Sequence, residues 1–430
     1  MLIGNAPRRV AIVGGSRTPF ARAYGAYNGS TNQQLLTAAL SAVVERFGLR
    51  GQRLGDVIGG ATLKHSRDFN LTRESLLSAG LDPETPGLDL QRACGTSLEA
   101  AILVANKIAL GQIDAGIAAG VECISDPPVV YPDSYRQLLL ASHRGRSLGQ
   151  RLAPFLRLRP HDFKPQLPAV VEPRTGLSMG QSCELMVKRW KITREEQDRV
   201  ACESHVKTAR AWQEGFYDDL VVPYAGLKRD NNVRADTTME KLATLRPVFD
   251  TRGTGTLTAG NSTPLTDGAS AVLLASEDWA RERNLPVLAW LRAGKTWAVD
   301  FASGKEGLLM APVYAVSAML RDTGLALQDF DYYEIHEAFA AVPLCSLRAW
   351  ESAEFCRERL GRPQPLGSID LSRLNVKGGS VAVGHPFAAT GARIVAGLAK
   401  LLATDATAKR GLVSVCTAGG MGVSAILERV

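Results

Sequence analysis

The sequence lacks long apolar runs and paired cysteine motifs, and each absence argues against a class of protein. In 430 residues no window approaches about 18 consecutive apolar residues, which argues against a membrane-spanning helix. The N-terminal segment contains no charged stretch followed by an apolar stretch and a cleavage site, so we expect a mature cytoplasmic chain that begins at Met1. The seven cysteines include no CxxC pair, which argues against a disulfide framework and against a zinc site.

The composition is that of a folded protein whose charge is unevenly distributed. Hydrophobic residues make up 45% and charged residues 22% of the chain, which provides a core for two or three domains and argues against disorder. The net charge is +7, and most of it lies in residues 134–165, which hold seven cations and one anion, Asp162. The chain has no recognisable nucleic-acid-binding motif, so we expect no nucleic-acid partner. The seven cations are Arg136, Arg144, Arg146, Arg151, Arg157, Arg159 and Lys164.

Strands and helices alternate in both halves of the chain. A strand, a helix and a second strand follow one another near the N-terminus, and a similar order recurs near the C-terminus. This order indicates a duplicated α/β unit with mostly parallel sheets covered by helices. The predicted elements are strands at 9–15, 56–58, 115–120, 269–275, 331–335 and 411–416, and helices at 35–47, 98–110 and 313–322.

The region between the halves has a different composition. Residues 126–173 contain eight prolines and no clean periodicity, which predicts an inserted, loop-rich segment. Two amphipathic helices are expected next, at 179–190 and 194–216, with Thr193 as the N-cap of the second and Glu196 completing a capping box. The predicted domains are an N-terminal half of residues 1–124 plus 247–284, an inserted loop domain of residues 125–246, and a C-terminal half of residues 285–430.

A cysteine stands immediately before the helix predicted at 98–110. In the segment QRACGTS, Cys94 lies at the helix N-terminus, where the helix dipole lowers the pKa of a thiol and backbone N–H groups can stabilise an oxyanion. Gly95 and the small residues after it leave room for a substrate. Cys94 is therefore a candidate nucleophile, and the alternative is a buried structural cysteine.

Three further motifs stand at strand ends or at turns before helices. In GHP, His385 precedes a helix of small residues and could accept a proton from a thiol, unless it is a structural turn histidine. Cys416 ends an apolar strand and is followed by closely spaced glycines, and His336 in HEAFA directly follows another strand. Because ligands bind beyond the carboxyl ends of strands in α/β sheets, these residues and Cys94 predict one site with a nucleophile, a base, an acid and an oxyanion partner.

These motifs resemble those of the thiolase family. The resemblance covers residues 8–430 and also includes the stretch AGNSTPLTDGA that starts at Ala259. Most thiolases have asparagine at the position of His336. The HEAFA form and the Pro- and Arg-rich insert are similar to the β subunits of trifunctional complexes of fatty-acid β-oxidation. The resemblance implies a duplicated thiolase-type fold, in which two similar α/β halves form αβαβα layers and carry an inserted loop domain.

The resemblance also implies a role for each motif residue. Cys94 would be acylated by a 3-oxoacyl-CoA, and His385 would take the proton first from Cys94 and later from coenzyme A. Cys416 would transfer the proton at C2 of acetyl-CoA, and His336 would help to hold the thioester oxygen. The backbone N–H groups of Cys94 and Ala418 would form a second oxyanion hole, although alanine restricts a backbone position where the family often has glycine. No metal or cofactor is implied, because coenzyme A is a substrate.

The same resemblance suggests where coenzyme A binds and which partners the chain has. Arg234 would meet the nucleotide end of coenzyme A. The resemblance implies a homodimer or a dimer of dimers. It also implies a hydratase–dehydrogenase α subunit as a partner. Residues 134–165 could form a solvated surface, a docking surface for a partner subunit or a membrane, or part of an acyl tunnel. Leucines and a phenylalanine among the arginines favour a contact surface. The expected lining of the pantetheine channel is Phe249, Ala259, Gly260, Thr263 and Phe339.

Several functions compete for this constellation. The leading hypothesis is a 3-oxoacyl-CoA thiolase of fatty-acid β-oxidation, and one alternative is a biosynthetic acetoacetyl-CoA thiolase. Cys416 argues against a decarboxylating ketoacyl synthase, because decarboxylation creates the carbanion without a second thiol. Against a catalytically silent lipid-binding subunit stands the presence of Cys94, His385 and Cys416 together.

Overall fold

Within residues 7–430, which the computed structural model describes, ten strands form one continuous sheet. Their order is β4-β3-β5-β6-β1-β7-β10-β9-β8, with the short β2 beside β6. The pairing of β1 with β7 joins the strands of the N-terminal half to those of the C-terminal half. The strands are β1 (Val10–Arg17), β2 (Ala21–Arg22), β3 (Asp56–Gly59), β4 (Gly87–Asp89), β5 (Ala115–Glu122), β6 (Thr266–Ser276), β7 (Ala289–Ala298), β8 (Tyr332–Ile335), β9 (Arg410–Thr417) and β10 (Met421–Glu428).

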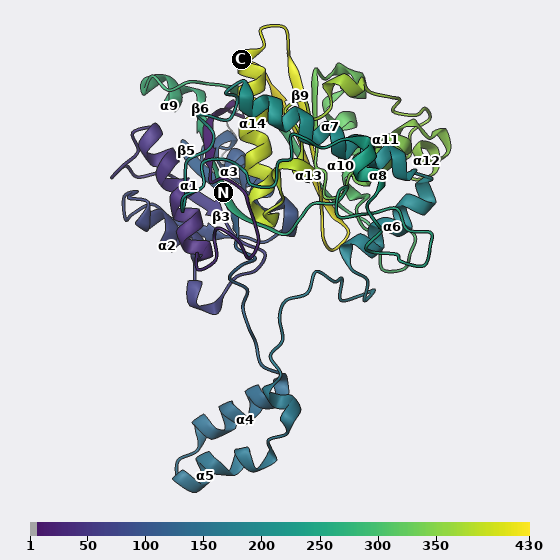
Figure 1. Ribbon diagram of the computed structural model, residues 1–430. Helices are drawn as coiled ribbons and strands as arrows, with labels where there is room; N and C mark the ends of the chain where they lie inside the picture. Colours follow the sequence, from purple (N-terminus) through teal and green to yellow (C-terminus); the bar gives the residue numbers. More distant parts are fainter. Residues whose placement is uncertain (1–6) are drawn as a thin grey trace.

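Helices cover both faces of the strands, as Figure 1 shows. The long helices follow the predicted segments closely, and the predicted capping box of Thr193 and Glu196 is confirmed. The helices are α1 (Asn32–Arg46), α2 (Leu71–Ser78), α3 (Thr96–Ala109), α4 (Asp133–Arg144), α5 (Leu148–Leu152), α6 (Met179–Trp190), α7 (Arg194–Gln213), α8 (Met239–Ala243), α9 (Glu277–Glu282), α10 (Ala311–Thr323), α11 (Ala341–Glu351), α12 (Ala353–Glu358), α13 (Ser380–Val383) and α14 (Thr390–Thr404).

Alternate residues of the strands pack into different layers. In the N-terminal half, Val13 and Leu273 belong to the core that α1 covers, whereas their neighbours Ile12 and Leu274 belong to a central core with α3 and α14. Strands β9 and β10 contribute to this central core too, and their other face packs toward α10 and α11. Successive strand side chains point to opposite faces, so the N-terminal and C-terminal parts of the sheet lie on either side of the central core. The result is helix–sheet–helix–sheet–helix layers, which confirms the predicted layering.

The prediction of mostly parallel sheets is wrong. Only β3–β4, β3–β5 and β8–β9 are parallel among the described strands, and the other pairs are antiparallel. The periodicity of a sequence identifies a strand but does not give its direction. The turn of residues 418–420 is too short for a crossover connection, so β9 and β10 must run antiparallel.

The insert contains helices where the sequence predicted irregular loops. Residues 133–163, the helical hairpin from here on, include α4, α5 and two short 3₁₀ turns that project from the body in Figure 1. Of residues 131–170, all of which the structure describes, only Asp162 is buried. Helix α4 is amphipathic and packs on the other elements of its own hairpin rather than on the main core.

One helical segment of the main body is long and apolar enough to cross a membrane. This segment, Phe387–Thr404, includes α14, and 72% of it is buried inside the protein. The sequence shows no uninterrupted apolar run here because two charged residues, Arg393 and Lys400, interrupt this segment. The segment lies in the central core, where any buried helix needs the same apolar composition.

Candidate active site

The turn that carries Cys94 connects β4 to α3. Residues Ala93–Gly95 form a single 3₁₀ turn, and Ala93 has a φ of 44°, in the left-handed region that alanine rarely adopts. A Cβ atom on Gly95 would lie 2.8 Å from Cγ2 of Val423 and 2.9 Å from Cγ2 of Thr417. Glycine therefore lets the turn pack directly against β9 and β10, which brings Cys94 close to the motif at the end of β9.

The turn that carries His385 connects α13 to α14. Gly384 has a φ of 106°, and the His385 backbone N–H donates to Oγ1 of Thr266 at 2.7 Å. On the side chain, Nδ1 of His385 lies 2.6 Å from Oγ1 of Thr390, in the first turn of α14. The imidazole is 2% exposed, and these two contacts fix both ends of the residue.

The other two motifs follow β8 and β9, as predicted. The His336 backbone N–H donates to the carbonyl of Ser414 at 2.8 Å, which extends the β8–β9 ladder by one residue. Nε2 of His336 lies 3.3 Å from Nε2 of His385, and the two rings are 4.2 Å apart between centroids. Cys416 is 2% exposed near the end of β9, where Gly419 in the following turn donates its N–H to Glu172 at 2.6 Å.

One cavity of about 250 Å³ unites these motifs. Cys94, His385 and Cys416 line it, although Cys94 lies about 300 residues before the other two, and His336 is not among the lining residues. Three residues predicted for the pantetheine channel line the same cavity, namely Phe249, Thr263 and Phe339. The rings of Phe249 and Phe339 meet edge to face, with centroids 5.7 Å apart.

The other predicted coenzyme A contacts lie in a second cavity. Arg234, Ala259 and Gly260 line a hollow of about 170 Å³, together with Arg22 and Lys241, two further cations that the sequence did not single out. Three cations are a suitable environment for the phosphates of a nucleotide. Only the tertiary structure could identify Arg22, because it lies more than 200 residues before Arg234 in the sequence. Lys241 follows Arg234 by seven residues and forms an ion pair with Asp236 in the same cavity.

A third cavity begins at the other side of Cys94. It has a volume of about 220 Å³ and mostly apolar walls, which include Leu63, Ile124 and the segment 167–172. This segment connects the helical hairpin to α6, so the base of the insert forms the wall, while residues 134–165 do not line this cavity. This role could not be predicted from the sequence because the segment is irregular and has no motif.

Burial determines the protonation of the catalytic candidates. It raises the pKa of the Cys94 thiol to about 12, although the backbone N–H groups of Ala418 and Cys94 lower it by hydrogen bonding to the sulfur. The expectation that the helix N-terminus makes Cys94 acidic is therefore wrong, because the cost of desolvating a thiolate is larger. Burial and the neighbouring Cys94 also raise the pKa of Cys416.

Both histidines are neutral for the same reason. Burial lowers the pKa of His385 to about 3, and burial together with His385 lowers the pKa of His336 well below its usual value. The resting site therefore holds neutral thiols and neutral imidazoles. A thiolate forms only when an imidazole accepts the proton during the reaction, which suits a base and a nucleophile that act together. Among residues 7–430, no group of three or more His, Cys, Asp or Glu side chains could hold a metal ion.

Comparisons with known proteins agree with this geometry. The thiolase N-terminal domain matches residues 10–278, and the thiolase C-terminal domain matches residues 286–429. The 3-ketoacyl-CoA thiolases of Yersinia pestis (strain Pestoides F) and Yersinia pseudotuberculosis serotype O:1b (strain IP 31758) are each 40% identical over 426 residues, or 98% of this chain and 97% of theirs.

Solved structures give the same result. The acetyl-CoA acetyltransferase of Bacillus anthracis is 30% identical with a TM-score of 0.82, and the match covers 99% of this chain and 100% of that one. Human mitochondrial 3-ketoacyl-CoA thiolase in complex with CoA is 28% identical with a TM-score of 0.80, and the match covers 98% of both chains. The duplicated α/β fold predicted from the motifs is thereby confirmed, and the chain belongs to the thiolase family.

Proposed function

We propose that this enzyme is an acyl-CoA acyltransferase that cleaves 3-oxoacyl-CoA with coenzyme A in fatty-acid β-oxidation. The observation that carries the proposal is the single cavity in which two thiols, Cys94 and Cys416, lie with the imidazole of His385. Thiolysis needs a nucleophile for the C3 carbonyl and an acid for C2, and this pair of cysteines supplies both. The 40% identical relatives named 3-ketoacyl-CoA thiolase support the same reaction.

The first half of the reaction acylates Cys94. His385 accepts the thiol proton as Sγ attacks the C3 carbonyl, and the N–H groups of Cys94 and Ala418 stabilise the resulting oxyanion. The C2–C3 bond then breaks, and its electron pair passes to C2 as the enolate of acetyl-CoA. Cys416 gives its proton to C2 and recovers one from His385, so that acetyl-CoA leaves a neutral site.

The second half transfers the acyl group to coenzyme A. His385 takes the proton from the incoming thiol, whose sulfur attacks the Cys94 thioester, and the proton returns to Cys94 as the shortened acyl-CoA leaves. The cavities of about 250 and 220 Å³ meet at Cys94, which both line. Both cavities have mostly apolar walls. We assign the first, which Phe249, Thr263 and Phe339 line, to pantetheine and the second to the acyl chain.

The proposed function is tested by mixing the enzyme with coenzyme A and 3-oxoacyl-CoA substrates of increasing chain length. We expect acetyl-CoA and a shortened acyl-CoA to form, with higher kcat/KM for chains that fill the acyl cavity than for acetoacetyl-CoA. Turnover of acetoacetyl-CoA alone would favour the biosynthetic alternative. If no substrate is cleaved, the proposed reaction is wrong and the silent lipid-binding subunit is favoured.

Changing Cys416→Ser separates the two halves of the chemistry. We expect exchange of the C2 hydrogens of acetyl-CoA with solvent to fall by about 10²- to 10⁴-fold, because serine is a much weaker acid than the thiol it replaces. Acyl transfer from a simple thioester to Cys94 needs no proton at C2 and should fall less than about tenfold. Both rates are followed by mass spectrometry, and undiminished hydrogen exchange would contradict the role of Cys416.

We also propose that this chain forms a homodimer or a dimer of dimers. We propose the cytoplasm as its location and a hydratase–dehydrogenase α subunit as its partner. The open edge of the sheet supports self-association. Strand β4 is the last strand on its side, Leu88 in it is 43% exposed, and Cys94 follows it after a few residues. A free edge strand can pair with the same strand of a second copy. Sedimentation or light scattering measures the mass directly.

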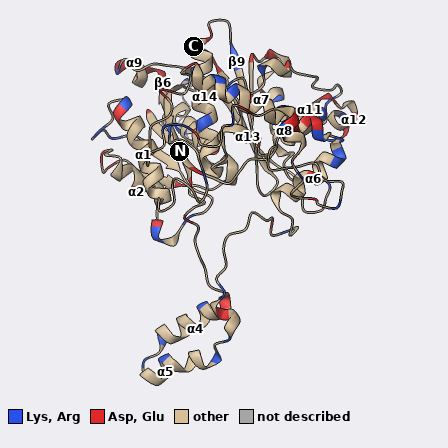
Figure 2. Ribbon diagram, in the orientation of Figure 1, with Lys and Arg blue, Asp and Glu red and all other residues tan. Residues whose placement is uncertain are grey.

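The helical hairpin is the proposed contact with an anionic phospholipid surface. Its six arginines and the adjoining Lys164 are exposed, and among the described residues only Arg136 of these seven cations forms an ion pair, with Asp133 at 2.9 Å. Apolar side chains stand beside them, with Leu148 74% and Leu156 89% exposed. In Figure 2 the hairpin stands away from the body, and blue ribbon segments mark its Lys and Arg residues along α4 and α5. Exposed leucines and arginines on one projection are the combination that binds a membrane interface.

Five substitutions test this contact without changing the site. The variant with Arg144, Arg146, Arg151, Arg157 and Arg159 changed to Gln should keep its turnover within about tenfold, because none of the five lines a cavity next to Cys94. Its cosedimentation with phosphatidylglycerol vesicles should fall strongly, and wild-type binding should fall with added salt. Equal vesicle binding by both proteins contradicts the proposal, whereas loss of α-subunit binding alone assigns the hairpin to that partner.

A further inference from the structure

A chain of buried polar groups leads from the catalytic histidines into the protein interior. Nδ1 of His336 lies 2.9 Å from Oγ of Ser380, the first residue of α13. A terminal nitrogen of Arg393, in the first turn of α14, donates to the same Oγ at 3.0 Å. Ser380 is fully buried and Arg393 is 9% exposed. The proposed chemistry uses neither residue.

The chemistry of arginine fixes the direction of these hydrogen bonds. A guanidinium has donors and no acceptor, so Oγ of Ser380 must accept from Arg393. The hydroxyl has one proton to give, and within residues 7–430 its only other side-chain contact is Nδ1 of His336. Ser380 therefore donates to Nδ1, and an imidazole nitrogen that accepts carries no proton. The proton of the neutral His336 ring is then on Nε2.

The contacts on the other side of His336 agree with this direction. With a proton on Nε2 of His336, the neighbouring Nε2 of His385 at 3.3 Å must accept. His385 then carries its own proton on Nδ1, which donates to Oγ1 of Thr390 at 2.6 Å. A single donor-to-acceptor direction thus satisfies every hydrogen bond in the chain from Arg393 to Thr390. It also leaves Nε2 of His385 unprotonated, so this nitrogen can take the Cys94 proton once its single lone pair is released from the His336 N–H.

We infer that Arg393 and Ser380 are positioning residues that hold His336 as its Nε2–H tautomer, so that this N–H can stabilise the thioester oxygen of the substrate. The inference rests on the proposed function for its catalytic meaning, although the tautomer itself does not. In the opposite tautomer Nε2 would present a lone pair to the developing negative charge and could not stabilise it. When His385 becomes protonated, its Nε2 can no longer accept, and the His336 N–H turns to the substrate.

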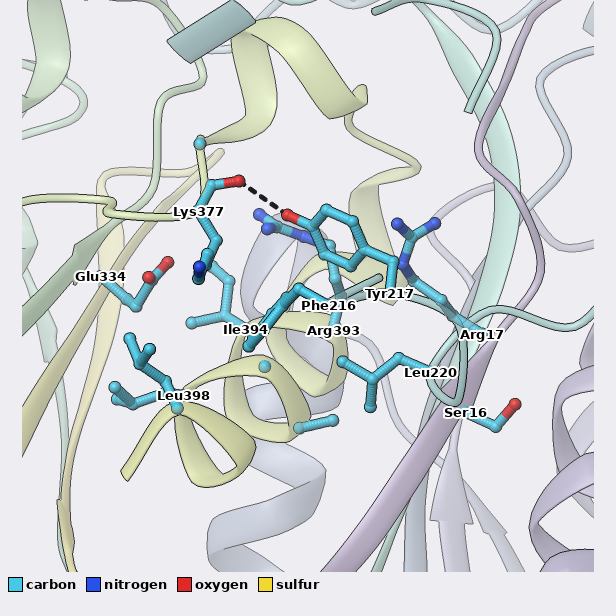
Figure 3. Close-up of a pocket in the computed structure, with 14 residues that line it drawn as sticks. Ser16, Arg17, Phe216, Tyr217, Leu220, Glu334, Lys377, Arg393, Ile394 and Leu398 are labelled. Atoms are coloured by element: carbon cyan, nitrogen blue, oxygen red, sulfur yellow. Dashed lines mark hydrogen bonds between the residues drawn. The ribbon is translucent and has the colours of Figure 1, made fainter. Parts of the chain in front are cut away.

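Acidic groups lie close to the buried guanidinium of Arg393. Figure 3 shows Arg393 with Glu334, Lys377 and Tyr217 around a hollow of about 30 Å³. Burial lowers the pKa of Arg393, and Glu334 and Glu337 oppose that fall. Glu334 lies in β8, two residues before His336. Burial raises the pKa of Glu334 to about 7, and Arg393 opposes that rise. The cation therefore sits beside acidic groups of the same strand and motif that position His336.

Activity measurements on four proteins test the pathway through His336. Changing Ser380→Ala should lower kcat for thiolysis at least tenfold with a smaller change in KM, because a transition-state contact is lost. In the His336→Asn background, the same change should lower kcat less than about threefold, because no tautomer remains to be set. A tenfold loss in both backgrounds, or no loss in either, overturns the inference. Ser346→Ala is the matched control, since Ser346 is also buried and bonds only to the carbonyl of Val342.

A spectroscopic test needs no turnover and so separates this inference from the proposed function. The ¹⁵N shifts of the histidine rings distinguish a protonated from an unprotonated nitrogen, and the His336→Asn spectrum identifies the signals of His336. We expect an unprotonated Nδ1 in the wild type and a protonated or mixed Nδ1 in Ser380→Ala. Arg393→Lys, which still donates, should keep the wild-type signal, whereas Arg393→Met, which has no donor, should not. A wild-type Nδ1 that carries the proton overturns the assignment even if the enzyme is active.

Discussion

Changing Cys94→Ala is expected to abolish thiolysis of 3-oxoacyl-CoA, with a loss of about 10⁴-fold or more in kcat. The thiol is the group that forms the covalent bond to the acyl chain, and no other nucleophile stands where the pantetheine and acyl cavities meet. Cys416 lines the pantetheine cavity but not the acyl cavity, so an acyl group bound to Cys416 could not occupy the acyl cavity. Within residues 7–430, Cys94 is the cysteine that lines both cavities.

Mass spectrometry identifies the acylated residue directly. After exposure of the wild type to 3-oxoacyl-CoA without free coenzyme A, the acyl mass should appear on the peptide that contains Cys94 and be absent from Cys94→Ala. Cys356→Ala is a suitable control, because Cys356 is buried and its sulfur contacts the carbonyl of Trp350 at 3.4 Å, away from the cavity. Acylation of Cys416 in the wild type would sink the assignment of the nucleophile.

His385→Asn and His336→Asn are expected to differ by about two orders of magnitude in kcat. An asparagine at 385 can still bond to Thr390 but cannot accept the proton of a thiol whose pKa burial has raised to about 12. Loss of a general base costs about 10²- to 10⁴-fold, and we expect the upper part of that range. At 336 the amide of asparagine replaces one N–H donor by another, so the loss should stay near about tenfold.

The measurement is a comparison of kcat and of the acylation burst in the two variants. His385→Asn should show almost no burst, whereas His336→Asn should show a slower burst of full amplitude. Equal and near-complete loss in both variants would mean that the two imidazoles share the role of base. Because burial holds His385 neutral down to about pH 3, protonation of this residue should not limit the wild type between pH 5 and 8.

The sequence by itself determined much of the local structure and of the chemistry. Segment 179–190 was predicted as a helix and is one, and Thr193 caps the next, because a cap and an amphipathic period act within a few residues. Cys94, His385 and Cys416 could be chosen because each stands beside glycines at an expected strand end or turn. The domain limits at residues 124, 246 and 284 stay predictions.

Tertiary structure decided what depends on distant neighbours. The antiparallel pairings and the approach of Arg22 to Arg234 arise from segments that meet only in the folded chain. The thiol of Cys94 is the clearest case, because its position before α3 predicts a lowered pKa, while burial by side chains from both halves raises it. Desolvation acts through every surrounding atom, and a sequence does not state which atoms those are. For the same reason, the bond from Arg393 through Ser380 to His336 became visible only when β8, α13 and α14 were placed side by side.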